Sequence, residues 1–196
     1  DPYVLGPYLA KEGAELRPHR QSDERAEELA ALIHRRAGVV EDRKRLEQRM
    51  KGIDVSIRGI TSALAKLIAD IDRHMLRLIE QLGWGEDYRF CLSVPGIGPV
   101  TATCLLIAYN RSICANADQF IAFLGLDVRK RQSGRYVGQC KLSKLGDPEL
   151  RRALFCATQA ACCYPPFEQF RQAQLAKALA KTGAKVILAR KLPRVA

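Results

Sequence analysis

Histidine and paired cysteine, the side chains that most often bind zinc, are scarce or badly spaced in this chain. Its 196 residues hold three histidines and seven cysteines, and no CxxC pair is present. The sequence therefore argues against a zinc finger. An odd cysteine count among mostly apolar neighbours predicts reduced thiols packed in a core rather than a disulfide framework.

Long apolar runs and a secretion signal are missing as well. No stretch is apolar enough to span a bilayer, so we expect a cytoplasmic protein with no membrane partner. Apolar residues still make up 47% of the chain, which is enough to form a buried core. The length suits one large domain or two small ones.

Acidic residues are missing from the end of the chain, where none follows Glu168. Residues 129–196 hold 15 Lys and Arg against 3 Asp and Glu, whereas residues 1–128 hold 17 against 18. Such asymmetry predicts a polyanionic partner, with nucleic acid as the first candidate. A basic surface kept for solubility is the alternative.

Apolar residues recur at heptad spacing through the first half of the chain. They are Leu46, Met50, Ile53, Ile57, Ile60, Leu64, Leu67, Ile71, Met75, Leu78 and Leu82. This pattern predicts coiled-coil helices over residues 22–83, with Ser22 as an N-cap and Gly52 and Gly59 as candidate breaks. A seam of this length needs a partner surface. We favour a homo-oligomer joined through the coiled coil over an intramolecular hairpin packed on the rest of the chain.

A compact helical unit is expected to follow in residues 86–196. Helices are predicted over residues 86–92, 100–109, 118–124, 148–163 and 166–180. Strand signals are weak, and the sequence supports at most a short ribbon around residues 136–142. The predicted fold class is therefore mainly α, a long coiled-coil-like helical region followed by a compact helical domain.

The segment Val94-Pro95-Gly96-Ile97-Gly98-Pro99 has the pattern of a helix-hairpin-helix turn. Gly96 and Gly98 permit a tight turn and leave backbone N–H groups free at the start of the next helix, where a phosphate can bind. The turn itself holds no lysine or arginine. The alternative is therefore a helix-helix turn that only organises the core.

The most basic segment surrounds a serine. Candidate nucleic-acid contacts there and downstream are Arg129, Lys130, Arg131, Gly134, Arg135, Lys141, Lys144, Arg151 and Arg152. Glycine beside Ser133 lets the backbone approach a ligand, and the cations favour phosphates. No histidine lies nearby in sequence to take a proton from Ser133, so the residues alone favour a phosphate-binding hydroxyl over a nucleophile. Tyr136 and Phe170 are candidates for base stacking, with packing as the default.

Several segments occur in an order and spacing that resemble the C-terminal domain of the IS-one-ten family of insertion-sequence transposases. They are Leu92-Ser93-Val94-Pro95-Gly96-Ile97-Gly98-Pro99, Phe120-Ile121-Ala122-Phe123-Leu124-Gly125-Leu126, Gln132-Ser133-Gly134, Lys141-Leu142-Ser143-Lys144-Leu145-Gly146 and Leu150-Arg151-Arg152-Ala153-Leu154. The resemblance covers most of residues 86–192. The heptad region is similar to the coiled coil that joins the two domains of these enzymes.

This resemblance implies a DNA recombinase guided by an element-encoded RNA. Family members combine an N-terminal RuvC-like domain, whose acidic tetrad binds divalent metal such as Mg²⁺, with a C-terminal domain that carries a nucleophilic serine. Ser133 matches that serine, which reverses the preference drawn from the residues alone. Asp1 resembles the last metal-binding acid of the tetrad, and residues 1–18 resemble the end of the RuvC-like domain and its linker. Residues 86–196 then correspond to the C-terminal transposase domain.

Most of the RuvC-like domain, including the other three acids, has no counterpart in this sequence. One carboxylate cannot build a two-metal site, so the chain is not expected to perform recombination alone. The competing interpretation is a non-catalytic DNA-binding or oligomerisation module of helix-hairpin-helix type. An exposed Ser133 on a cationic surface would favour the transposase, and a buried, capping Ser133 would favour the module.

Overall fold

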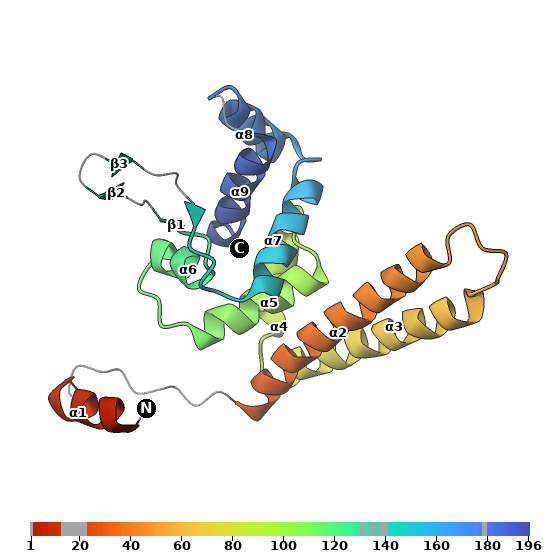
Figure 1. Cartoon of the computed structure of the whole chain (residues 1–196), viewed down its shortest axis with the longest axis horizontal. Coiled ribbons are helices and arrows are strands. Elements are labelled where there is room, and N and C mark those ends of the chain that lie inside the picture. The colour runs from red at the N-terminus through yellow and green to blue at the C-terminus, as the bar shows by residue number, and fades with distance from the viewer. Residues whose placement is uncertain (1, 13–22, 130–131, 134–135, 138–140, 178–179) are drawn as a thin grey trace.

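The computed structural model of the chain describes residues 2–12, 23–129, 132–133, 136–137, 141–177 and 180–196. Its architecture confirms the mainly α prediction (Figure 1). The helices are α1 (Pro2–Glu12), α2 (Glu24–Arg49), α3 (Arg58–Gln81), α4 (Gly85–Ser93), α5 (Pro99–Arg111), α6 (Ala117–Phe123), α7 (Pro148–Ala161), α8 (Pro165–Leu175), α9 (Lys181–Lys191) and the short 3₁₀ helix η1 (Leu192–Arg194).

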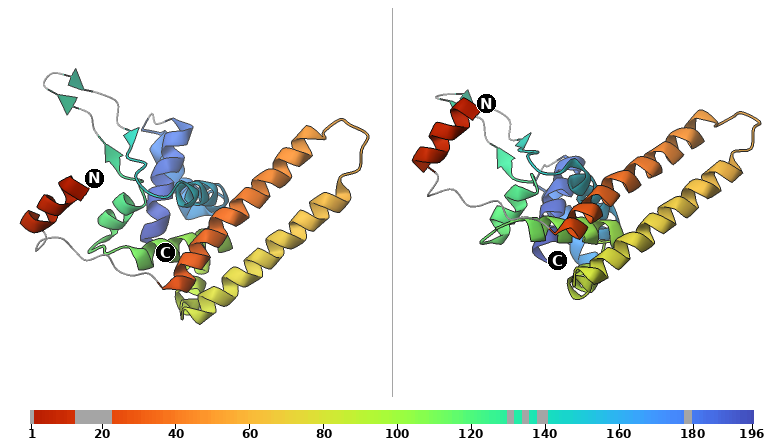
Figure 2. Two further views of the ribbon diagram at one scale, coloured as in Figure 1. Left: turned by 60° about the horizontal axis from the view of Figure 1, so that its bottom comes forward. Right: turned by 90° about the horizontal axis from the view of Figure 1, so that it is seen from below.

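Helices α2 and α3 form an antiparallel hairpin that projects from the rest of the molecule as an arm (Figures 1 and 2). The N-cap of α2 is Asp23, one residue after the predicted Ser22, and its carboxylate accepts a hydrogen bond from the Arg25 N–H at 2.8 Å. The break falls at Gly52, whose φ of +83° suits glycine, whereas Gly59 lies inside α3. The heptad pattern thus predicted both helices and one of the two candidate breaks correctly.

Within this single chain α2 packs against α3, as the alternative of an intramolecular hairpin predicts. Near the body its residues are buried, among them Leu29 and Leu78, but towards the tip Ile60 and Leu67 remain exposed. Arg36 crosses the seam to Asp72, with Nη2 3.1 Å from Oδ2. A single chain does not test self-association, which stays a prediction.

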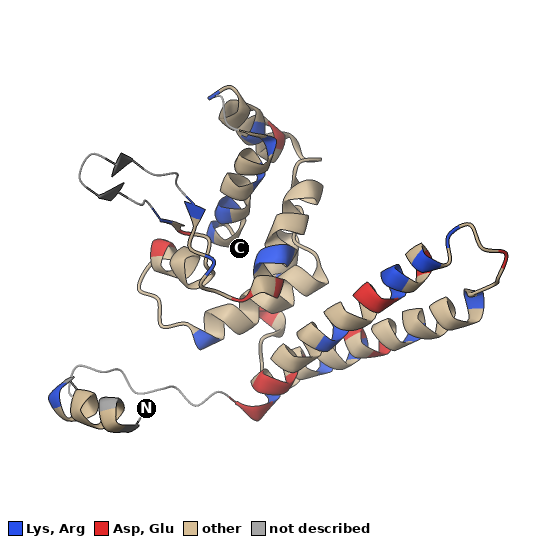
Figure 3. Ribbon diagram, viewed as in Figure 1, with Lys and Arg blue, Asp and Glu red and all other residues tan. Residues whose placement is uncertain are grey.

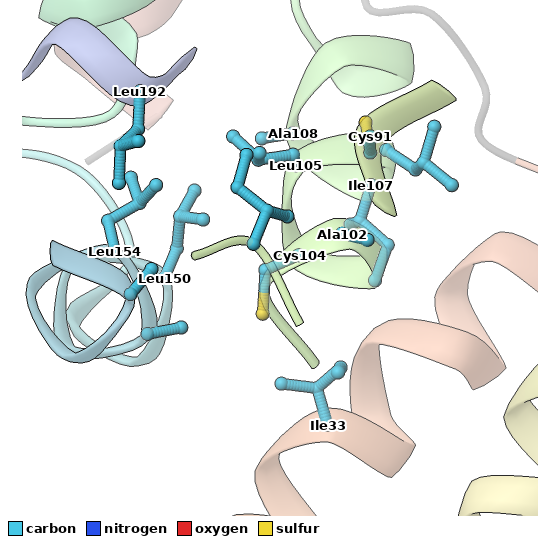
Figure 4. Packing of buried hydrophobic residues seen from close by; sticks show 14 of the residues in the cluster. Ile33, Cys91, Ala102, Cys104, Leu105, Ile107, Ala108, Leu150, Leu154 and Leu192 are labelled. Carbon is cyan, nitrogen blue, oxygen red and sulfur yellow. The ribbon is translucent and has the colours of Figure 1, made fainter. Parts of the chain in front are cut away.

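Helix α5 lies at the centre of the compact part. All eight of its residues from 101 to 108 are buried, and α2, α4 and α7 pack around it. Side chains of α5, of α7 and of Leu192 meet in one cluster, which Ile33 of α2 joins from the arm (Figure 4). Helix α9 covers α7 and α8. The base of the arm and the compact part therefore share one hydrophobic core.

A narrow β-ribbon leaves this body between α6 and α7. Its stem pairs β1 (Val128–Arg129) with β4 (Lys141–Leu142), and its outer part pairs β2 (Gln132–Ser133) with β3 (Tyr136–Val137), both antiparallel. The ribbon begins eight residues earlier than the sequence suggested. Its strands carry a weak signal because each is two residues long.

Helix α1 is joined to α2 by residues outside the described part of the chain. Apolar side chains of α1, including Tyr3, Leu5, Tyr8 and Leu9, are exposed. Among the described residues, no helix combines the length and the apolar character that a bilayer crossing requires.

Replacement of one buried arm residue tests whether the base of the arm belongs to the core. Ile79 is 1% exposed and Leu76, less than one turn away on α3, is 41% exposed. We expect Ile79→Ala to lower the free energy of unfolding by about 2–5 kcal/mol, because it leaves a cavity in the shared core. Leu76→Ala, the matched control, is expected to cost less than about 1 kcal/mol. Urea unfolding measures both, and equal effects would contradict a shared core.

Candidate nucleic-acid interface

The stem of the ribbon is tied to the body by hydrogen bonds that continue its ladder. The Ser143 N–H donates to the Asp127 carbonyl at 3.0 Å, and the Ser143 hydroxyl donates to the Asp127 carboxylate. One residue on, the Lys144 N–H donates to the Gly125 carbonyl at 3.2 Å. These bonds follow the Val128↔Leu142 pair on the side nearer α6 and α7, so they fix the orientation of the stem relative to the body.

Ser133 is the last residue of β2 and pairs with Tyr136 of β3 at the outer end of the ribbon. Its backbone is described, but its side chain is not, so the exposure that would discriminate the two interpretations stays untested. Five further predicted site residues lie outside the described part of the chain. They are Asp1, Lys130, Arg131, Gly134 and Arg135.

Three predicted cations surround the stem and are exposed. Arg129 and Lys141 face each other in the β1–β4 pair, and Lys144 follows two residues after β4. None of the three forms an ion pair or hydrogen bond through its side chain with a described residue. Their charges are therefore available to a polyanion.

The two predicted arginines of α7 are engaged inside the protein. Arg151 donates from Nη1 to the Gly146 carbonyl. Arg152 donates from Nε and Nη2 to Glu149, with Nη2 2.7 Å from Oε2, and this bond raises the pKa of Arg152. Both arginines hold α7 to its own surroundings, although Arg152 remains on the surface.

The C-terminal helices α8 and α9 carry further Lys and Arg residues (Figure 3). The β1–β4 stem lies beside α9 in all three ribbon views (Figures 1 and 2). Some of the cations there are occupied: the Lys191 ammonium lies 4.1 Å from the centre of the Phe170 ring. Arg171, together with the amide of Gln172, lowers the pKa of Glu168 to about 2, so this ion pair persists through the physiological range.

Phe170 is thus a packing residue: it is half-buried against the core, and a lysine already occupies the face of its ring. The side chain of Tyr136, the other candidate for base stacking, is not described. The default interpretation of packing therefore holds for Phe170.

The Gly96 turn faces the protein interior. Gly96 has a φ of +93°, and a Cβ placed there would lie 2.6 Å from the Ala161 backbone nitrogen and 2.8 Å from the Ala157 carbonyl oxygen of α7. The flanking Val94 and Ile97 are buried. Gly98, the N-cap of α5, has open space around its Cα. The turn therefore organises the packing of α4, α5 and α7, and only its Gly98 side is open.

Cysteine burial agrees in part with the expected core thiols. Cys91 and Cys104 are buried, and burial raises the pKa of Cys104 to about 12, which keeps its thiol protonated. Cys114 and Cys162 are half-buried, whereas Cys156 and Cys163 are exposed. Each of these six described thiols is free.

The fold also brings a histidine to a place that sequence spacing does not reveal. His34 of α2 lies with Nε2 3.3 Å from the carboxylate of Asp147, the N-cap of α7. The contact joins residues more than a hundred positions apart, so no local motif announces it. Among the described residues, no three His, Cys, Asp or Glu side chains gather as a metal site requires.

Together these elements define a helical protein with a basic β-ribbon that carries a serine at its outer end. Residues 88–172 match the family model described as Transposase IS116/IS110/IS902 family. The matched segment runs from α4 into α8 and contains the ribbon, and it supports a transposase function. No curated protein matches the chain.

The two glycines of the turn give a test of its inward packing. We expect Gly96→Ser to destabilise the fold by about 2 kcal/mol or more, because the side chain meets α7 and the φ is unfavourable for other residues. Gly98→Ser is expected to be neutral or slightly stabilising, because serine is a preferred N-cap. Thermal unfolding of both variants measures the difference. Equal tolerance at the two positions would show that the turn does not press on α7.

Proposed function

We propose that this chain is the arm and serine-bearing portion of an insertion-sequence DNA transposase of the recombinase type. The observation that carries the proposal is the family match over residues 88–172, which includes the ribbon, Ser133 and the exposed cations around its stem. Nucleic acid binds through the ribbon and the basic C-terminal third. The partners are target DNA and an element-encoded guide RNA.

In the proposed reaction the Ser133 hydroxyl attacks a DNA phosphorus. An oxygen–phosphorus bond forms, the bond from phosphorus to one deoxyribose oxygen breaks, and the leaving oxygen takes up a proton while a base receives the serine proton. The phosphodiester energy is kept in the covalent protein–DNA bond, so rejoining needs no ATP. Arg129, Lys141 and Lys144, at the stem and its foot, bind phosphates of the same DNA.

Mg²⁺ belongs to the acidic domain of the complete enzyme. The residues of this chain do not fit such a site by themselves, because Asp1 is the only matching acid and lies outside the described residues. When bound, the metal would supply Lewis-acid chemistry at the phosphate. The contribution of this chain is the serine, the cations and their placement.

The arm gives the proposed enzyme a surface for self-association. Towards its tip, apolar residues that the hairpin leaves exposed are Ile53, Val55, Ile60 and Leu67. A second copy that packs there would bury them and extend the heptad seam into an intermolecular coiled coil. We propose a homo-oligomer on this basis.

A non-catalytic DNA-binding module is the second candidate, because the exposed cations of the stem would support binding without chemistry. In that case Ser133 contacts phosphate only through a hydrogen bond. The helix-hairpin-helix form of this candidate is weakened, since Gly96 packs against α7 and the turn holds no cation.

Salt dependence tests the binding surface. We expect Arg129→Ala, Lys141→Ala and Lys144→Ala each to reduce the slope of log K against log salt by about 0.9, because each removes one phosphate contact with double-stranded DNA. Lys66→Ala, an exposed lysine on the arm, is the matched control and is expected to leave the slope unchanged. Fluorescence anisotropy across a salt series measures this. Slopes that do not respond to the stem variants would count against the proposed surface.

Covalent trapping tests the serine. The chain, with and without a supplied RuvC-like domain, is incubated with guide RNA, Mg²⁺ and nicked target DNA and run on a denaturing gel. With the supplied domain, we expect a protein–DNA adduct that Ser133→Ala abolishes and that Ser56→Ala, an exposed serine in the arm loop, preserves. If binding persists but no adduct forms even with the acidic domain, the non-catalytic module is the better description.

A further inference from the structure

Two backbone segments meet at the foot of the ribbon with no room for a side chain between them. A Cβ placed on Gly125 would lie 2.5 Å from the Gly146 nitrogen and 2.9 Å from the Leu145 nitrogen. A Cβ placed on Gly146 would lie 2.5 Å from the Leu124 carbonyl carbon. The backbone just after α6 therefore packs directly against the backbone just before α7. Only glycine permits so close a contact.

The ladder of the stem starts from this contact. The Lys144 N–H bonds to the Gly125 carbonyl, the Ser143 N–H bonds to the Asp127 carbonyl, and the β1–β4 pair follows. Lys144 itself has a φ of +57°, a left-handed conformation that surrounding contacts must maintain in a residue other than glycine. The backbone of the β1–β4 stem is thus fixed within a few residues of the two glycines.

Arg151 links the Gly125–Gly146 contact to α7 through a hydrogen bond. Its guanidinium donates to the Gly146 carbonyl, and Nη1 lies 3.0 Å from the Cβ position of Gly125. The side chain is partly buried, and α7 holds it in register through the Asp147 N-cap and the bond from the Arg151 N–H to the Asp147 carbonyl at 3.2 Å. One guanidinium therefore binds the Gly146 side of the contact and fills the space beside Gly125.

We propose that Arg151 is a positioning residue that locks the foot of the ribbon and so holds Ser133 in place for its phosphate. This inference rests on the proposed function for its reference to Ser133, whereas the lock itself does not depend on it. Arg151 acts through the Gly125–Gly146 contact and makes no phosphate contact of its own. Its neighbour Arg152 differs, because its guanidinium bonds to the carboxylate of Glu149, also on α7.

Charge alone would assign Arg151 to phosphate binding, and the two roles predict different results. A phosphate ligand contributes about 0.9 to the salt slope of DNA binding, and a positioning residue contributes nothing. A positioning residue protects the Ser143 and Lys144 amides from hydrogen exchange, because local opening of the ribbon foot exposes them. A phosphate ligand leaves this protection in the free protein unchanged.

The experiment compares Arg151→Ala and Arg151→Lys in the whole chain, with Arg152→Ala as the matched control. We expect Arg151→Ala to speed exchange of the Ser143 and Lys144 amides by about tenfold or more, since it removes a charged hydrogen bond from the foot. Exchange in α5 and the salt slope should stay unchanged. Arg151→Lys should restore part of the protection, and Arg152→Ala should leave both amides as they are.

Covalent trapping adds the functional readout. We expect adduct yield to fall by about tenfold in Arg151→Ala, with DNA affinity nearly unchanged, because orientation rather than binding is lost. A salt slope that falls by about 0.9 with normal exchange would overturn the proposal in favour of a phosphate ligand. If wild-type protein forms no adduct even with the supplied RuvC-like domain, the proposed chemistry fails, and the exchange data still test the role of Arg151 at the ribbon foot. Should Arg151→Ala not fold, Arg151→Lys reports on the same contact.

Discussion

Burial of α5 is the constraint from which the rest of the structure follows. A helix with eight consecutive buried residues needs neighbours on every side, because its apolar surface extends all the way round. The base of the arm, α4 and α7 supply them. The tight Gly96 turn joins α4 to α5 and packs directly against α7. Helix α9 covers α7 in turn. The shared core thereby fixes α7, the helix that follows the ribbon.

Charge in the C-terminal third separates into two groups with different physical roles. Arg152 and Arg171 pair with acids one turn away, and Lys191 covers an aromatic ring. These cations stabilise helices and packing. Arg129 and Lys141 lie on the stem without an internal partner among the described residues, so their charge is directed to solvent. A net charge calculated from sequence mixes the two groups, and only their contacts separate them.

Local patterns predicted the elements well and their mutual placement poorly. The heptads gave α2 and α3, and the helix predicted over residues 148–163 begins where α7 begins, because helix periods and helix starts depend on neighbouring residues. The choice between a hairpin and an intermolecular coiled coil depends on tertiary contacts that the seam does not encode. The Gly125–Gly146 contact and the His34–Asp147 pair join residues far apart in sequence. Gly125 and Gly146 belong to two of the segments that resemble the transposase family. The close backbone contact that requires glycine at both positions is visible only in the fold.

The candidate site places Ser133 on a ribbon of very short strands, whereas the proposed reaction requires an accurately positioned serine. Strands of two residues have little stability of their own, so a ribbon built from them takes its direction from whatever closes its foot. A serine that attacks phosphorus must be held close to an in-line geometry, and small displacements are costly. Because α7 packs against the buried α5, the placement that we propose for Ser133 depends on the same core that organises the fold.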